Sequence, residues 1–264
     1  MIGSLVVLAV AASARAEPCP PGMRRVAGGA YQMASGEDAS VGAFCMDLTE
    51  VTVAAYRRCV DAGVCHAEEL ACGGAATWGK PGTQNHPVNC VTWFEADAFC
   101  RAHGKRLPSE PEWEWAARGG RRGQTYPWGE AAPADRACWD GEGNSAGKGD
   151  RTGTCRVGAN PRSTSREGFQ DLAGNVREWT ATEVGRFRVL RGGSWGDSLP
   201  EFLSAGFRGW NAPDERIELT GFRCAAEVGA KAQAPQRKLA KAKAVLRDDG
   251  VLVMPEEWSR AGKR

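Results

Sequence analysis

The chain has 264 residues, enough for one large domain or two small ones. Its formal charge of +2 and pI near 8.0 give no reason to expect nucleic acid or an anionic membrane as a partner. Function classes that depend on a strongly basic or acidic surface are therefore excluded.

Residues 1–16 predict a secretory signal peptide. The apolar run Leu5–Ala12 is too short to span a bilayer, and Ala14-Arg15-Ala16 is a small-x-small cleavage pattern before Glu17. No basic residue precedes the run, so a buried N-terminal strand stays the alternative. No later stretch reaches the length of a transmembrane helix, and we expect a secreted or periplasmic protein without a membrane span, as a monomer.

The first predicted elements are strands and a helix. Residues 24–33 predict a strand, a glycine turn and a second strand. A threonine within residues 49–52 can cap a helix that ends at Gly63. Residues 64–89 are rich in Gly, Pro and Asn, so they predict a loop held by cysteines in place of a core. The apolar face of the helix comprises Val53, Tyr56 and Val60.

Two capping boxes predict two further helices in close succession. Thr92 and Glu95 are three apart at the start of one, and Gly104 follows its end. Ser109 and Glu112 repeat the pattern at the start of the next. From residue 126 to residue 166 the chain is irregular and Gly-rich, yet it has aromatic and cysteine anchors that a disordered linker lacks.

Two carboxylates seven residues apart, Asp171 and Glu178, flank a glycine turn. Carboxylates together with backbone carbonyls are the oxygen ligands that calcium prefers. The alternative is that Asp171 is a turn residue and Glu178 a surface strand residue, and spacing alone favours this alternative.

The stretch from Arg188 to Ala226 begins as a strand that meets Gly192-Gly193, where the backbone can turn tightly. Residues 221–224 predict a short strand whose cysteine can be tied to an earlier part of the chain. The residues between lack a strong period and predict a long ordered loop of the kind that carries function. We call residues 195–218 the ligand loop.

The composition changes after Ala226. Residues 227–264 form a basic, Ala- and Lys-rich tail with few aromatic residues, which predicts a flexible or surface-lying appendage. Within it, residues 251–255 predict a strand that docks back. The domain itself is expected to span residues 17–226.

Ten cysteines in an exported chain predict disulfides. Zinc is not expected, because the chain has no C-x-x-C pair and its three histidines are scattered. The residues alone leave the pairing open.

Five motifs occur in an order and at spacings that resemble the formylglycine-generating enzyme (sulfatase-modifying factor) family, over about residues 19–226. They are Arg106-Leu-Pro-Ser-Glu-Pro-Glu-Trp-Glu-Trp-Ala-Ala-Arg118, Tyr126-Pro-Trp-Gly129, Asp171-Leu-Ala-Gly-Asn-Val-Arg-Glu-Trp179, Arg191-Gly-Gly-Ser-Trp195 and Gly221-Phe-Arg-Cys-Ala225. The resemblance implies one α+β domain with the formylglycine-generating-enzyme fold, related to C-type lectin-like domains, with short strands, two or three helices and much ordered loop.

Active members of this family oxidise a sulfatase cysteine with copper held by two cysteines five apart, in the loop after the Gly-Gly-Ser turn. This chain has no cysteine between Cys155 and Cys224. Copper(I) prefers soft thiolate ligands, so copper is not expected here. Arg177 also stands where the family commonly has tryptophan, which puts the family's substrate contacts in doubt.

The resemblance also implies which structural features persist. It pairs Cys100 with Cys224, and it favours calcium bound by Asp171, Glu178 and, by analogy, Gly174 and Val176. The family's other calcium loop is lost around Cys138, where a Cys138–Cys155 disulfide is expected in its place. On this view Glu178→Gln removes a calcium ligand with little effect on the calcium-free protein.

Three functions remain in competition. The first is a non-catalytic module whose ligand loop binds an unknown protein or small molecule. The second is a cysteine-independent periplasmic enzyme of the family, such as the type that assists siderophore maturation. The third and least favoured is formylglycine synthesis on sulfatases. The candidate ligand residues of the loop are Trp195, Asp197, Glu201, Arg208, Asn211 and Asp214.

Overall fold

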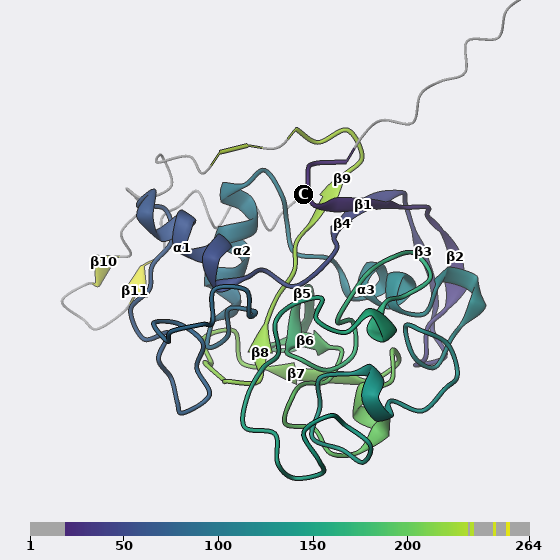
Figure 1. The fold of residues 1–264 in the computed structure, drawn as a ribbon. Helices are drawn as coiled ribbons and strands as arrows, with labels where there is room; N and C mark the ends of the chain where they lie inside the picture. The colour runs from purple at the N-terminus through teal and green to yellow at the C-terminus, as the bar shows by residue number, and fades with distance from the viewer. Residues whose placement is uncertain (1–18, 232, 235–244, 247–251, 254–264) are drawn as a thin grey trace, which may run out of the picture.

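The computed structural model describes residues 19–231, 233–234, 245–246 and 252–253, and the predicted signal peptide and most of the tail lie outside them. The fold is α+β, with three helices, several small sheets and long connecting loops (Figure 1). The predicted class is therefore confirmed. Besides four short 3-10 turns, the elements are β1 (Met23–Val26), β2 (Gly29–Gln32), β3 (Asp38–Val41), β4 (Phe44–Asp47), α1 (Val53–Asp61), α2 (Trp93–Ala102), α3 (Glu110–Ala117), β5 (Arg177–Val184), β6 (Phe187–Arg191), β7 (Arg208–Asn211), β8 (Thr220–Gly221), β9 (Ala225–Glu227), β10 (Val245–Leu246) and β11 (Leu252–Val253).

All three helices begin at the predicted caps. The hydroxyl of Thr52 accepts from the backbone of the third helical residue of α1, and Thr92 and Ser109 form complete capping boxes at α2 and α3. A side-chain cap of this kind contributes about 1 kcal/mol, because it satisfies a backbone donor that the helix leaves free.

The first predicted strands form, but they do not pair with each other. β1 pairs with β4, and β2 pairs with β3, each antiparallel. Between β1 and β2 the chain passes close to another segment, since a Cβ at Gly28 would lie 2.3 Å from the carbonyl oxygen of Val41. β4 also pairs with β9, so strands from the two ends of the domain, β1 and β9, flank β4 in one three-stranded sheet.

The central sheet has the order β7-β6-β5-β8, in which β5 and β8 are parallel. The strand predicted at residues 221–224 is wrong in its bounds, because β8 ends at Gly221 and β9 begins at Ala225. The residues between them are buried, and their side chains enter the core instead of alternating along a strand.

The core has three clusters. One joins α1 and α2 to Trp179 of the central sheet, and a second joins α3 to β4 around Trp113. The third lies under the loops around Trp139. Each buried tryptophan removes roughly 150–250 Å² of its surface from contact with water. These side chains therefore stabilise a domain that has little regular secondary structure.

All ten cysteines form disulfides. Cys100–Cys224 joins α2 to the residue before β9, as the resemblance implied, and the expected bond Cys138–Cys155 closes a loop. The other pairs are Cys19–Cys45, Cys59–Cys65 and Cys72–Cys90. Five disulfides indicate an oxidising compartment.

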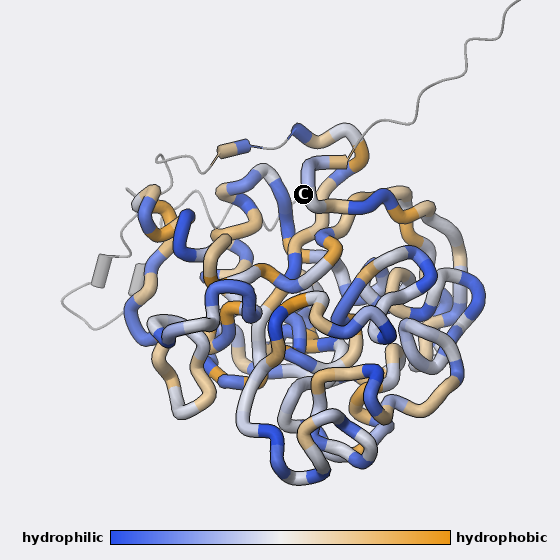
Figure 2. Tube along the Cα trace, viewed as in Figure 1, coloured by the Kyte–Doolittle hydropathy of each residue, from blue (hydrophilic) through white to orange (hydrophobic). Residues whose placement is uncertain are grey.

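Figure 2 shows short apolar segments that alternate with polar ones along the described chain. No helix in this part of the protein is long and apolar enough to cross a membrane. In the tail, β10 and β11 pair with each other as an antiparallel ribbon, and β11 falls within the strand predicted at residues 251–255.

Candidate functional site

The candidate site begins at the tight turn after β6. Gly192 and Gly193 both have positive φ angles, of 96° and 66°. A Cβ at Gly193 would lie 2.4 Å from the carbonyl oxygen of Phe202, so only glycine lets the loop return this closely. The turn therefore presents Ser194 and the residues after it at the end of the central sheet.

Asp197 is the centre of this turn. One carboxylate oxygen accepts hydrogen bonds from the backbone N–H and the hydroxyl of Ser194, at 2.7 and 2.8 Å. The other accepts from the guanidinium of Arg177, at 2.5 Å. Asp197 is buried, whereas the side chain of Arg177 is partly exposed. The guanidinium carbon of Arg177 lies 5.9 Å from the ring centre of Phe207. A closed ion pair thus lies at the start of the loop in which the resemblance places the family's copper-binding cysteines.

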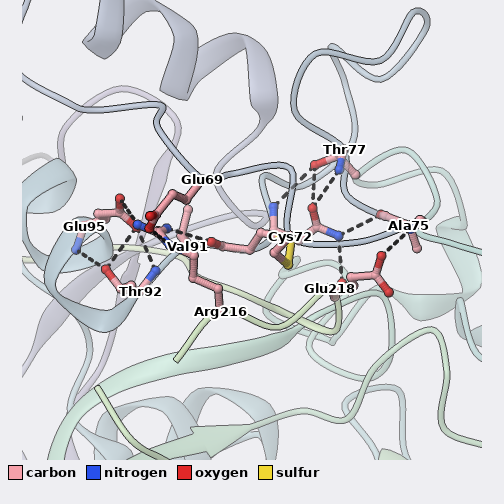
Figure 3. Close-up of a disulfide and its surroundings, with 12 residues drawn as sticks. Glu69, Cys72, Ala75, Thr77, Val91, Thr92, Glu95, Arg216 and Glu218 are labelled. Carbon is pink, nitrogen blue, oxygen red and sulfur yellow. Dashed lines mark hydrogen bonds and ion pairs between the residues drawn. A yellow bond between two sulfur atoms is a disulfide. The ribbon is translucent and has the colours of Figure 1, made fainter. Parts of the chain in front are cut away.

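The other end of the ligand loop is fixed to α2 and to the loop before it. Figure 3 shows Arg216 reaching Glu95, with distances of 2.6 and 2.9 Å to its two oxygens. Glu218 accepts from the backbone of Ala75, and its carbonyl oxygen accepts from Asn89 at 2.7 Å. Both ends of the ligand loop are therefore anchored.

The predicted ligand residues do not converge on one cleft. Trp195 donates to the carbonyl of Glu218 at 3.2 Å and lies at the turn with Asp197. Arg208 instead pairs with Glu110 of α3, at 2.7 Å, so its guanidinium joins the sheet to the helix. Glu201 and Asp214 are exposed, and Asn211 is half-buried on β7.

Two residues beside the turn were absent from the predicted ligand set. Arg177 is the ion-pair partner of Asp197, and Phe207 provides the ring beside its guanidinium. The sequence did contain a signal for Arg177. This arginine stands where the family commonly has tryptophan, and Asp197 lies in the segment that lacks the family's cysteine pair. A basic and an acidic residue at two such positions indicate an ion pair.

The predicted calcium residues lie around the turn before β5, but Glu178 faces Arg223. Its oxygens accept from this guanidinium at 2.8–3.0 Å and from the indole of Trp113 at 2.8 Å. Both charged side chains are fully buried. The alternative of a surface strand residue is wrong. As a set of four the predicted ligands do not fit calcium, because Glu178 is already satisfied by protein donors.

Asp171 has the positive φ of a turn residue, 57°, and is buried. It accepts from the backbone N–H of Gly158 at 2.5 Å. Near it lies Glu50, also buried, whose two oxygens have no hydrogen-bond partner in the described structure. Burial raises the pKa of Glu50 well above its usual range, and the charge of Asp171 raises this pKa further. An orphaned buried carboxylate beside a second one fits a cation, which the sequence pattern did not indicate.

Among the residues described, no group of three or more His, Cys, Asp or Glu side chains is arranged to hold a metal ion. A cation beside Asp171 would thus depend on two carboxylates and on backbone carbonyls, the donors that calcium accepts.

Comparison with known proteins agrees with the motifs. Inactive C-alpha-formylglycine-generating enzyme 2 of Bos taurus is 43% identical over 157 residues, which are 54% of this chain and 51% of that protein. Formylglycine-generating enzyme of Thermomonospora curvata is 38% identical over 172 residues, 54% of this chain and 56% of that protein. The chain spans about half the length of the curated relatives it matches.

A solved structure, that of PvdO from Pseudomonas aeruginosa, shares the fold at 24% identity, with a TM-score of 0.60 over 78% of this chain and 94% of that one. The family described as the sulfatase-modifying factor enzyme 1-like domain matches residues 9–228. This range covers most of the chain and contains both the closed turn at Asp197 and the buried pair of Glu178 and Arg223. Because the match is this long, the chain belongs to the sulfatase-modifying factor family.

Proposed function

We propose that this protein is an exported, non-catalytic binding module whose ligand, a protein or a small molecule, contacts the first half of the ligand loop. The observation that carries the proposal is the pairing of Asp197 with Arg177 and Ser194. A buried carboxylate with this many donors is held in place, and its lone pairs are not available to remove a proton from a substrate.

The remaining acids of the loop do not support an enzyme either. Glu201 and Asp214 are exposed, and although Tyr126 lies near enough to Glu201 for burial and this charge together to raise the pKa of the tyrosine, the carboxylate is open to water. General acid–base catalysis needs a group within hydrogen-bond reach of the reacting atoms in a site that excludes water. The geometry therefore favours binding over the siderophore-type enzyme.

The surface around the turn has features of a binding face. Leu199, two residues after Asp197, is 47% exposed. The side chain of Arg177 is 27% exposed, so part of this cation lies at the surface, where it suits a ligand carboxylate. The relatives in cattle and mouse, named as inactive, agree with loss of the family's chemistry, although the shared region is about half of those proteins.

Site-specific photocrosslinking tests the binding proposal. A photoreactive residue at position 199 should capture a discrete partner in the exporting host, whereas the same residue at exposed Asp61, at the end of α1, should not. With the captured partner purified, Leu199→Asp should weaken binding about tenfold or more, as expected for a central apolar contact. Equal capture at both positions, or unchanged affinity of Leu199→Asp, would contradict the proposal.

The mature protein is expected not to convert the cysteine of a sulfatase-type peptide to formylglycine. The ligand loop contains no cysteine, and all ten cysteines elsewhere are bonded in disulfides, so the loop offers no thiolate pair for copper(I). The assay supplies copper, oxygen and a reductant and traps aldehyde with a hydroxylamine probe, with an active family enzyme as positive control. Aldehyde formation on the peptide at a rate near that of the control would contradict the proposal of a non-catalytic binding module.

We propose that calcium, a structural ion, binds beside Asp171, with Glu50 and the carbonyls of Gly174 and Val176 as further ligands. At free calcium one hundred times the Kd, binding stabilises the native state by about 2.7 kcal/mol. Wild-type protein should thus melt several degrees higher in calcium than in chelator, and Glu50→Gln should lose most of that shift. Identical melting of the wild type in both conditions would rule the site out.

A further inference from the structure

A cavity of about 350 Å³ lies against the disulfide Cys138–Cys155, and Asp171 also lines it. Cys155 is half-buried and Cys138 is 7% exposed, and both line the cavity together with Arg151. A molecule that enters the cavity therefore reaches a sulfur–sulfur bond and a positive charge together.

Arg151 touches both sulfurs. Its guanidinium nitrogen lies 3.0 Å from Sγ of Cys155 and 3.5 Å from Sγ of Cys138. A second guanidinium N–H donates to the carbonyl of Trp139 at 2.8 Å, which fixes the group in place. Arg151 makes no ion pair with a carboxylate in the described structure, so its charge is not neutralised by a direct partner. Burial lowers its pKa, and the charge of Asp140 partly offsets this.

We propose that Cys138–Cys155 is a reactive disulfide, a site of exchange with an incoming small thiolate that enters through this cavity. A cation beside a cysteine sulfur stabilises its thiolate and so lowers the pKa of the thiol. A thiol of lower pKa is the better leaving group in exchange. Because Arg151 lies closer to Cys155, this sulfur is the leaving group and Cys138 is the sulfur attacked.

The reaction is balanced as two exchanges. In the first, an external thiolate attacks Sγ of Cys138, a mixed disulfide forms, and the Cys138–Cys155 bond breaks with its electron pair on Cys155. The Cys155 thiolate is then held by Arg151. In the second, another thiolate attacks the incoming sulfur and releases Cys138 as a thiolate. The external thiol is oxidised to its disulfide, and the protein gains two electrons.

The exchange site is joined to the ligand loop by short backbone contacts, although the proposed reactivity does not depend on the function proposed above. The carbonyl of Cys138 accepts from Asn175 at 2.7 Å, and the carbonyl of Asn175 accepts from Trp195 at 2.8 Å. The backbone of Asp140 donates to the carbonyl of Asp197 at 3.0 Å. Opening the disulfide would release a segment that supports the turn of the candidate site.

Graded reduction of the folded protein tests the proposal. Reduced glutathione is added at neutral pH in increasing amounts, free thiols are alkylated, and the modified cysteines are mapped by mass spectrometry. Cys138 and Cys155 should be labelled before the other eight cysteines, and the mixed disulfide should carry glutathione on Cys138. The internal comparison is Cys72–Cys90, since Cys72 is exposed but no guanidinium is bonded to its sulfur in the described structure.

Matched arginine variants separate the charge at the sulfur from the charge of the cavity. Arg151→Gln should slow the exchange, because the leaving-group thiol then has a higher pKa. If the rate depends on the leaving-group pKa as steeply as it does on the pKa of attacking thiols, the slowing is about threefold for each pKa unit. Arg151→Lys should retain most of the rate. Arg156→Gln removes a charge from the same cavity without a bond to either sulfur and should leave the rate unchanged.

Three results would overturn the proposal: reduction of Cys72–Cys90 before Cys138–Cys155, glutathione on Cys155 instead of Cys138, or equal rates for Arg151→Gln and Arg156→Gln. The first two are measured on the wild-type protein, so they decide the matter even where Arg151→Gln fails to fold.

Discussion

Replacing Glu178 with Gln is expected to destabilise the protein by about 3–5 kcal/mol in calcium and in chelator alike, because the change leaves Arg223 buried without its counter-charge. Both side chains are fully buried, and the guanidinium makes three contacts of 2.8–3.0 Å to the carboxylate. Burial lowers the pKa of Arg223, but the charge and hydrogen bonds of Glu178, together with the charges of Glu50 and Asp171, more than offset this, so the guanidinium stays charged in the core. A fall in Tm of roughly 10 °C is the expected readout.

The matched control is Glu183→Gln on the same strand, β5. Glu183 pairs with Arg188 at 2.6 Å, but its side chain is 65% exposed, so the loss should be about 1 kcal/mol or less. A double variant with Arg223→Leu should recover part of the loss of Glu178→Gln, because the orphaned charge is then absent. A loss in Glu178→Gln no larger than in the control would show that the buried pair does not hold the core together.

This expectation replaces the one made from the sequence, that Glu178→Gln spares the calcium-free protein. The motif around Glu178 correctly indicated an important carboxylate. Its partner lies 45 residues further along the chain, and no local pattern shows that Arg223 enters the core between β8 and β9. The sequence thus located Glu178 but not its partner, the guanidinium of Arg223.

The local elements were the most predictable part of the fold. The caps at Thr52, Thr92 and Ser109 depend on residues within three positions of each other, so the sequence alone shows them. Strand partners are decided by contacts between distant segments. For this reason the strands at residues 24–33 were found, but their pairing with β4 and β3 was not.

The candidate site was predicted only in part. The Gly-Gly turn and Trp195 lie where the family motif indicated, and the missing thiolates follow from the sequence. Of the polar residues in the ligand loop, Arg208 was assigned from its position in the loop, but α3 provides its partner Glu110. A charged residue in a loop is satisfied by whichever opposite charge the tertiary fold brings near, and sequence position does not reveal that neighbour.

Removing the disulfide Cys100–Cys224, by changing both cysteines to Ala, is expected to destabilise the protein by about 4–5 kcal/mol. The two cysteines are 124 residues apart, so in the chain-entropy account this bond removes much of the freedom of the unfolded chain. Urea unfolding monitored by tryptophan fluorescence measures the loss, since buried Trp93 and Trp179 belong to the same core cluster as the disulfide.

The pair Cys59–Cys65 gives a matched control, because all four cysteines lie in that one buried cluster and each change removes the same two sulfur atoms. Only the loop differs: a separation of 6 residues should contribute about 2 kcal/mol by the same relation. The double Ala variant at Cys100 and Cys224 should therefore lose roughly twice as much free energy of unfolding as the one at Cys59 and Cys65. Equal losses would mean that packing of the sulfurs, and not restriction of the unfolded chain, is what these bonds contribute to the domain.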